Sequence, residues 1–296
     1  MKKYYNPVKV IRSNNWKLDL DISLKKLDIL NPILISSIGN KIRLDLDSKF
    51  KKDSIFTDFI SNPTFDNCDS AINFCKNKDF DGVIAIGGGS AMDLAKVILS
   101  HLCLKKSTVL ELIEYDRKYP NKIPSIFLPT THGTASEMTK WGTIWNLKEK
   151  KKYSISHNDL YPNFAILDGN LTLSLPLDIS IITSMDALSH SFESIWNKNA
   201  NPTSTKYAIE AISIIIENIF LLKKNQNNLK LRNNLLNASS IAGLAFSNTT
   251  TAAAHSISYP LTIHYGIPHG IASSLTLIAL LDINKIDNDF TKGEGF

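Results

Sequence analysis

An aspartate and a histidine, four residues apart, are the side chains of this chain whose types and spacing favour metal chemistry. Asp186 and His190 stand in a segment with helical spacing, and Thr183 or Ser184 can cap a helix that starts there. Residues i and i+4 project from one helix face, so both side chains point to the same spot. A carboxylate and an imidazole offer lone pairs that a divalent cation prefers. The alternative for such a pair is a polar helix surface without a ligand.

Two further histidines complete a candidate metal site. His255 and His269 lie on either side of Pro260 and Pro268, so we expect them to come from two different segments. Together with Asp186 they extend the pair to an Asp-His-His-His set around one divalent ion.

A triple-glycine turn marks a second candidate site, for a phosphate. It lies between a strand pattern and a helix pattern and consists of Gly87, Gly88 and Gly89. Glycines let a phosphate approach the backbone, and the N–H groups and partial positive charge of the following helix start bind an anion. Ser90 adds a hydroxyl or caps the helix. Asp93, expected in the first turn of the helix, interacts favourably with the helix dipole or contacts the ligand. The pattern is neither G-x-G-x-x-G nor a Walker sequence, and a plain tight turn is the alternative.

A threonine-rich segment, Pro129–Glu137, follows the apolar run Ile123–Leu128. Its hydroxyls, on Thr130, Thr131 and Thr134, would stand at the carboxyl end of a strand, where open α/β sheets bind ligands. The alternative is a polar connection with no ligand.

The first half of the chain must position these segments on a sheet. Strand patterns cover Pro32–Ser36, Ser54–Ile60, Gly82–Gly87, Ile123–Leu128 and Ala165–Asp168, and helical patterns cover Asp69–Lys78 and Ser90–Leu102. Apolar runs that alternate with helices predict a mostly parallel sheet with helices on both faces.

The second half is predicted to be helical. Its helical patterns cover Ile181–Trp196, Thr203–Leu222, Asn228–Phe246 and Ile271–Ile286. The chain is therefore interpreted as α/β plus all-α, with an α/β domain over residues 1–174 and a helical domain over residues 175–296.

Composition excludes several classes of protein. Hydrophobic residues make up 43% and charged residues 21%, as in ordinary globular proteins, and a net charge of +5 comes with no nucleic-acid-binding motif. Three cysteines without C-x-x-C spacing argue against a disulfide framework or a zinc ribbon. The start of the chain lacks a signal-peptide pattern, and the most apolar run, Ala211–Leu222, is too short to span a bilayer. These features predict a cytoplasmic protein that binds neither nucleic acid nor membranes.

The order of the motifs resembles the iron-containing (group III) alcohol dehydrogenases from about residue 30 to the end. Gly-Gly-Gly-Ser-x-x-Asp is followed by Pro-Thr-Thr-x-Gly-Thr-x-Ser-Glu, then Asp-x-x-x-His, then two histidines fourteen apart. The resemblance implies a Rossmann-like dinucleotide-binding domain, a helical metal-binding domain with dehydroquinate synthase-like architecture, and catalysis in the cleft between them. The segments most similar to the phosphonoacetaldehyde reductase branch are Trp141–Trp145, Asp186–His190, Glu193–Asn197 and Ser258–Thr262.

The resemblance also implies roles for individual residues. It places Fe²⁺, or Zn²⁺, on Asp186, His190, His255 and His269. It places the pyrophosphate of NAD(H) or NADP(H) at Gly87, Gly88, Gly89 and Ser90, with Asp93 nearby. Thr130, Thr131 and Thr134 would line the nicotinamide side, Asn62 matches an Asn-Pro-Thr segment, and Lys152 matches a lysine near the cofactor ribose. A homo-oligomer is expected.

Several residues depart from the family pattern. Tyr259 stands where many members carry a further histidine that assists proton movement. His132, expected on an exposed loop, and Ala135 interrupt the threonine-rich loop where small residues, usually glycine, are expected. Ser37 replaces an aspartate that would repel a 2′-phosphate, so NADPH is not excluded.

The implied reaction is NAD(P)H-linked, metal-dependent reduction of a small aldehyde to a primary alcohol, with phosphonoacetaldehyde to 2-hydroxyethylphosphonate as one candidate. A general primary-alcohol or diol dehydrogenase is the alternative enzyme. Members of the family usually carry several more helices after the segment that resembles Ile271–Asn284, whereas this sequence stops at Phe296. A truncated remnant that binds cofactor or metal without turnover is therefore the alternative from another class.

Overall fold

The computed structural model describes residues 3–115 and 117–286, in two compact units. The α/β unit comprises Pro7–Thr130 and Thr139–Asp168. The helical unit comprises Thr131–Met138 and the chain from Gly169 onward, together with the residues before Pro7. The domain limits of 1–174 and 175–296 stay a prediction.

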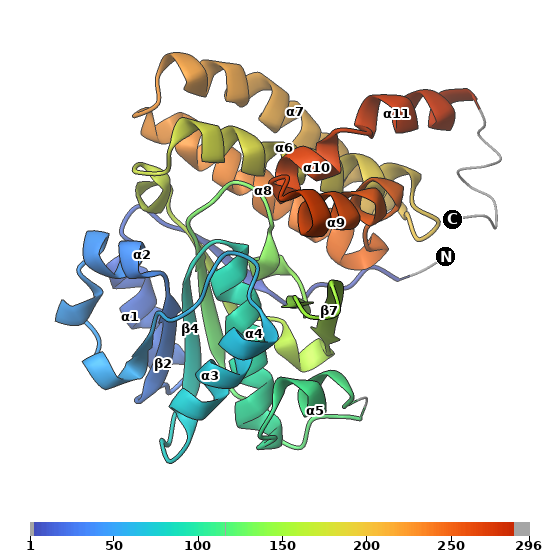
Figure 1. Cartoon of the computed structure of the whole chain (residues 1–296). Coiled ribbons are helices and arrows are strands. Elements are labelled where there is room, and N and C mark those ends of the chain that lie inside the picture. The colour runs from blue at the N-terminus through green and yellow to red at the C-terminus, as the bar shows by residue number, and fades with distance from the viewer. Residues whose placement is uncertain (1–2, 116, 287–296) are drawn as a thin grey trace. The chain divides into compact units, whose positions relative to one another are not determined.

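The α/β unit is built on one parallel sheet of six strands, which confirms the predicted architecture. The strand order is β1 (Lys9–Arg12), β8 (Phe164–Leu167), β5 (Ser125–Pro129), β4 (Gly82–Gly87), β2 (Pro32–Ser36) and β3 (Ile55–Phe56). Crossovers between parallel strands are right-handed, so the direction in which the chain moves along the sheet decides the face that each helix covers. The helices α1 (Trp16–Lys26) and α2 (Ile38–Arg43) lie on one face, and α3 (Phe65–Cys75) and α4 (Gly89–Leu104) lie on the other (Figure 1).

The core of this unit explains why its strands read as continuous apolar runs. All six residues of β4 are buried, because this strand lies in the middle of a sheet that is covered on both faces. The helix α4 packs on this sheet and buries twelve side chains. The three cysteines are buried and free, and burial raises the pKa of the Cys75 thiol to about 12. These thiols therefore pack as small apolar groups and remain protonated.

Four strands of the α/β unit differ from the sequence-based expectation: β3 is shorter than expected, and β1, β6 and β7 were not expected. Only Ile55–Phe56 of the expected strand Ser54–Ile60 is extended, and a 3-10 turn over Lys52–Ser54 precedes it. The antiparallel hairpin of β6 (Trp141–Asn146) and β7 (Lys151–Ser156) was not expected, because lysines and asparagine hide its alternation. A short helix, α5 (Val109–Ile113), lies between β4 and β5 in the sequence.

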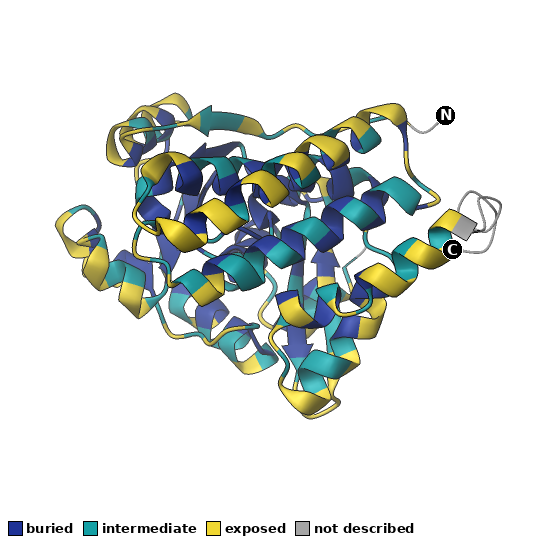
Figure 2. Ribbon diagram, turned by 90° about the horizontal axis from the view of Figure 1, so that it is seen from above, coloured by how far each residue is buried: buried dark blue, intermediate teal, exposed yellow. Residues whose placement is uncertain are grey.

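The helical unit has three long helices and three shorter ones among its described residues. They are α6 (Leu177–Trp196), α7 (Pro202–Lys224), α8 (Leu229–Thr249), α9 (Ala253–Tyr265), α10 (His269–Ser274) and α11 (Leu277–Ile286). Buried residues run along one side of the long helices and exposed residues along the other (Figure 2). Small side chains such as Ala187, Ala211 and Ala242 lie in the shared core, so the helix backbones approach closely.

Two expectations about this unit are wrong. The helix that carries Asp186 starts at Leu177, after Pro176, so neither Thr183 nor Ser184 caps it. Thr183 lies inside the helix, where its hydroxyl donates to the carbonyl of Ile179. His255 and His269 lie on two different helices, α9 and α10, as expected, but only Pro268 lies between these helices. Pro260 lies within α9, because one proline removes a single hydrogen bond without necessarily ending a helix. None of the helices in the described ranges is long and apolar enough to cross a membrane.

Candidate metal centre and phosphate loop

Three helices of the helical unit bring an aspartate and two histidines together. Asp186 of α6 places its Oδ1 3.4 Å from Nε2 of His255 on α9 and 3.7 Å from Nε2 of His269 on α10. One ligand atom of each residue lies within 4.8 Å of the others. Atoms that bind one ion at about 2.0–2.2 Å are separated from each other by about 3–3.6 Å. The spacing therefore fits a divalent cation held by one carboxylate and two imidazoles.

His190 lies beside this group without joining it. Its ring is parallel to that of His255 at 4.3 Å and to that of Phe246 at 4.0 Å, measured between centroids. Its Nδ1 is buried and has no hydrogen-bond partner among the described residues. Burial lowers the pKa of His190 to about 3, so the ring is neutral and keeps a lone pair. Its role as a fourth ligand stays a prediction.

Burial and charge oppose each other at the two central groups. Burial alone would raise the pKa of Asp186, but His190, His269 and His255 lower it, so the side chain is a carboxylate. Burial alone would lower the pKa of His255, but the carboxylates of Asp186 and Glu193, which face its two ring nitrogens, raise it to about 10. An ion pair between Asp186 and a protonated His255 is therefore the alternative to a site in which both side chains bind one metal ion. His255 Nε2 is nevertheless buried without a hydrogen-bond partner within the described ranges, which fits a metal ligand better.

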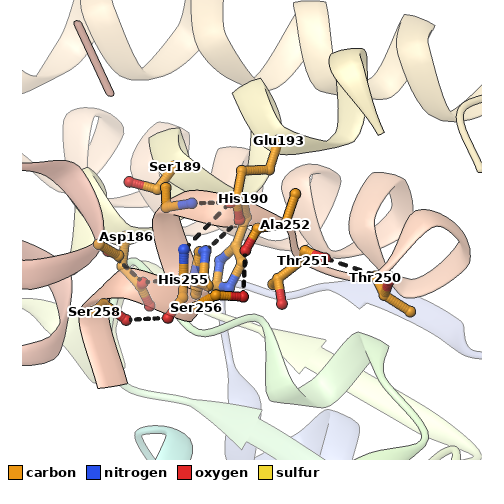
Figure 3. Close-up of polar contacts among 12 residues, drawn as sticks. Asp186, Ser189, His190, Glu193, Thr250, Thr251, Ala252, His255, Ser256 and Ser258 are labelled. Atoms are coloured by element: carbon orange, nitrogen blue, oxygen red, sulfur yellow. Dashed lines mark hydrogen bonds and ion pairs between the residues drawn. The ribbon is translucent and has the colours of Figure 1, made fainter. Parts of the chain in front are cut away.

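Each of the three clustered side chains also contacts a polar residue outside the cluster. Glu193 Oε2 lies 2.5 Å from Nδ1 of His255, and Ser273 Oγ donates to Asp186 Oδ1 at 3.1 Å. Ser258 Oγ lies 3.5 Å from Nδ1 of His269. Figure 3 shows Glu193 extending toward His255 beside His190 and Asp186.

The polar partners of the clustered side chains were not predicted from the sequence, although the helical spacing of Glu193 and Ser273 could have identified them. Glu193 follows His190 by three residues and Asp186 by seven, so the three lie on one stripe of α6. Ser273 follows His269 by four residues on α10, which is the same spacing as the aspartate and histidine first singled out.

The glycine turn of the α/β unit has the form of an anion site. Gly87 ends β4, and a Cβ there would lie 2.6 Å from that of Ala91, so only glycine allows this approach. α4 begins at Gly89 after Gly88, with no side-chain cap, which leaves its first N–H groups unpaired by a cap. The interpretation of Ser90 as the cap is wrong: its hydroxyl accepts a hydrogen bond from the N–H of Asn62 at 3.0 Å.

Other candidate cofactor residues surround this turn. The N–H of Thr130 donates to the carbonyl of Gly87 at 3.0 Å, so the ends of β4 and β5 are held side by side. Lys152 pairs across the hairpin with Trp145, whose N–H donates to the carbonyl of Pro63. Lys152 is thereby tied to the segment that contains Asn62. Asp93 was expected in the first turn of the helix, but it lies in the second turn of α4, so the interpretation that it suits the helix dipole is wrong. Whether these residues bind a cofactor stays a prediction.

The rest of the threonine-rich segment belongs to the helical unit. Thr131 and Thr134 flank Gly133, where a Cβ would lie 2.4 Å from the carbonyl oxygen of Thr183. His132 is fully buried, so its expected exposure is wrong. Burial lowers its pKa to about 3, because a charged imidazole cannot be solvated there. Ala135 has a φ of +46°, a left-handed conformation that the expected glycine would adopt without steric strain.

Two family models match most of the chain. Residues 29–169 match the family model "Iron-containing alcohol dehydrogenase", and residues 180–292 match "Fe-containing alcohol dehydrogenase family, C-terminal". The chain is 32% identical to long-chain-alcohol dehydrogenase 1 of Geobacillus thermodenitrificans, covering 85% of this chain and 64% of the relative. It is 32% identical to the 1-propanol dehydrogenase of Citrobacter freundii, covering 79% of this chain and 60% of the relative.

A solved structure is similar over nearly the whole chain. It is the sulfoacetaldehyde reductase of Bifidobacterium kashiwanohense in complex with NAD⁺, with a TM-score of 0.89 and 30% identity. The match covers 96% of this chain and 77% of that one. It confirms the predicted dehydroquinate synthase-like architecture. The chain spans less than two thirds of the length of the two curated relatives.

Proposed function

Since this chain belongs to the iron-containing alcohol dehydrogenase family, we propose that it reduces a small aldehyde to a primary alcohol with NAD(P)H and a bound divalent ion. The observation that carries the proposal is the convergence of Asp186, His255 and His269 within 4.8 Å. A carboxylate and two imidazoles form a site for Fe²⁺ or Zn²⁺, with His190 as the fourth candidate. When bound, the ion supplies Lewis acidity toward the aldehyde carbonyl and NAD(P)H supplies the hydride.

The chain's own residues hold and orient these groups. Asp186 contributes the buried negative charge, and Ser273 fixes the carboxylate through a hydrogen bond. His269, with 29% of its side chain exposed, is the most open of the three ligands and marks the side from which an ion can enter. The uncapped start of α4 presents N–H groups to the cofactor pyrophosphate. Asn62 and Thr130 flank that turn.

The substrate that we favour is an aldehyde with an anionic head group. The candidate reaction is the reduction of phosphonoacetaldehyde to 2-hydroxyethylphosphonate. The support is the likeness to a reductase named for sulfoacetaldehyde, which is also a two-carbon aldehyde with an anionic head. The alternative, a general primary-alcohol or diol dehydrogenase, is supported by relatives named for 1-propanol and long-chain alcohols.

The test is NADH and NADPH oxidation by the purified, Fe²⁺-loaded chain with phosphonoacetaldehyde, sulfoacetaldehyde and butanal. The proposal expects turnover with kcat/KM highest for the two anionic aldehydes. A preference for butanal would favour the general alcohol dehydrogenase. Bound cofactor and metal without turnover of any aldehyde would contradict an enzyme and favour the non-catalytic alternative.

A further inference from the structure

Glu193 is a fully buried carboxylate that accepts hydrogen bonds from two kinds of donor. Its Oε1 accepts from the N–H of Ala254 at 2.7 Å and from the N–H of His255 at 3.2 Å. Its Oε2 lies 2.5 Å from Nδ1 of the His255 ring. One side chain of α6 thus holds both the backbone and the ring of a candidate metal ligand on α9.

The backbone contacts replace a missing helix cap. α9 begins at Ala253 after Ala252, a residue without a side-chain acceptor, and no side chain of its own caps it. The first N–H groups of a helix need acceptors when they are buried. Glu193 supplies one from a neighbouring helix, and its negative charge suits the positive end of α9. The start of α9 is therefore fixed relative to α6, which carries Asp186.

The ring contact decides which nitrogen of His255 is free. An ionised carboxylate can only accept, so Nδ1 must carry the proton that faces Glu193. In a neutral ring the lone pair is then on Nε2, and Nε2 is the atom that faces Asp186 Oδ1 at 3.4 Å. A carboxylate on the far nitrogen of a histidine ligand fixes the ring orientation and strengthens the ligand.

We propose that Glu193 is a positioning residue of the metal centre: it fixes His255 in the Nδ1–H form, directs Nε2 to the ion, and anchors the ligand-bearing end of α9 to α6. With Asp186 it also provides two negative charges, which balance a divalent ion in a buried site. The inference rests on the proposed metal site.

The matched test is Glu193→Gln. A glutamine amide has one oxygen and one NH₂ group in place of two acceptors. If its oxygen stays on the α9 backbone, the NH₂ donates to Nδ1 and forces the proton onto Nε2, where it blocks the metal. If the amide group flips, its NH₂ group faces the two backbone N–H donors of α9, and the cap of that helix is lost. Glu217→Gln, an exposed residue of α7 in the same unit, serves as the control for a lost charge.

Zn²⁺ affinity is measured by competition with a chromophoric chelator, together with the melting temperature of the metal-free protein. We expect Glu193→Gln to weaken Zn²⁺ binding about 10- to 100-fold and Glu217→Gln to leave it unchanged. A Glu193→Gln protein that melts lower but binds Zn²⁺ as tightly as the wild type would overturn the inference, because the residue would then be a helix cap alone.

A second measurement does not depend on the folding of the variant. In the Zn²⁺-loaded wild type with ¹⁵N-labelled histidine, the inference expects His255 to carry its proton on Nδ1, in a strong hydrogen bond. A proton on Nε2 of His255 would overturn it. A wild type that binds no Zn²⁺ would contradict the metal site itself, whereas equal binding by the wild type and Glu193→Gln would contradict only the role of Glu193.

Discussion

Gly270 packs against the main chain of Ile182 so closely that a Cβ at position 270 would lie 2.0 Å from the Ile182 carbonyl oxygen. Gly270 follows the candidate ligand His269 on α10, and Ile182 precedes Asp186 by four residues on α6. The absence of a side chain at Gly270 therefore allows the two helices that carry these candidate ligands to approach.

Gly270→Ala is expected to push α10 away from α6 and to weaken metal binding. Overpacking a rigid contact costs about 1–3 kcal/mol, and each 1.4 kcal/mol that falls on the bound state corresponds to about tenfold in affinity. The measurement is the Zn²⁺ dissociation constant. Gly39→Ala is the control, because a Cβ there would meet nothing within 4 Å. Unchanged affinity in Gly270→Ala would show that this contact does not set the ligand spacing.

Ser37→Asp tests the cofactor preference. Ser37 caps α2 by accepting the N–H of Asn40, and aspartate is an equally good cap, so the helix start should survive the change. A carboxylate at the end of β2 would repel the 2′-phosphate of NADPH but not the ribose of NADH. We expect kcat/KM with NADPH to fall at least about tenfold while that with NADH changes little. An equal change with both cofactors would mean that Ser37 does not face the 2′ position.

His132 predicts a pH dependence of stability. Its pKa in the folded chain is lowered to about 3, below the value of about 6.5 expected when unfolded. Between these values the unfolded state binds the proton, so the free energy of unfolding falls as the pH falls from about 6.5 to about 3. This residue contributes a slope of at most about 1.4 kcal/mol per pH unit.

The slope is measured by urea unfolding at several pH values in wild type, His132→Leu and His264→Leu. We expect a shallower slope only in His132→Leu, since His264 is exposed. A slope that is the same in all three proteins would place the His132 ring in solvent, against the structure.

The parts of the fold that could be predicted from the sequence are those whose apolar residues follow one dominant pattern. Buried runs such as Gly82–Gly87 and the long helices α7 and α8 stand out because burial on two faces or along one stripe leaves a plain apolar pattern. The β6–β7 hairpin did not, because its exposed lysines and mixed burial weaken the alternation. The start of α6 was misplaced because a threonine inside a helix can bond back to its own backbone, as Thr183 does to Ile179.

The clustering of three candidate ligands was predictable from the sequence, but the residues that support them were not. Asp186, His255 and His269 are chemically distinctive and carry a recognisable spacing, whereas Glu193, Ser258 and Ser273 are ordinary in type. Their contribution depends on three helices whose packing is decided by close backbone approaches, such as that at Gly270. Likewise, nothing local distinguishes the buried His132 from a loop histidine in solvent.

The most direct measurement is the metal content of the purified chain, wild type beside Asp186→Ala and His269→Ala, after dialysis with Fe²⁺ under anaerobic conditions, with NADH-dependent aldehyde reduction recorded on the same samples. The account predicts one ion for each wild-type chain with turnover, and the loss of both ion and turnover in each variant. Turnover that survives in either variant, or a fully active wild type without a bound ion, would contradict it.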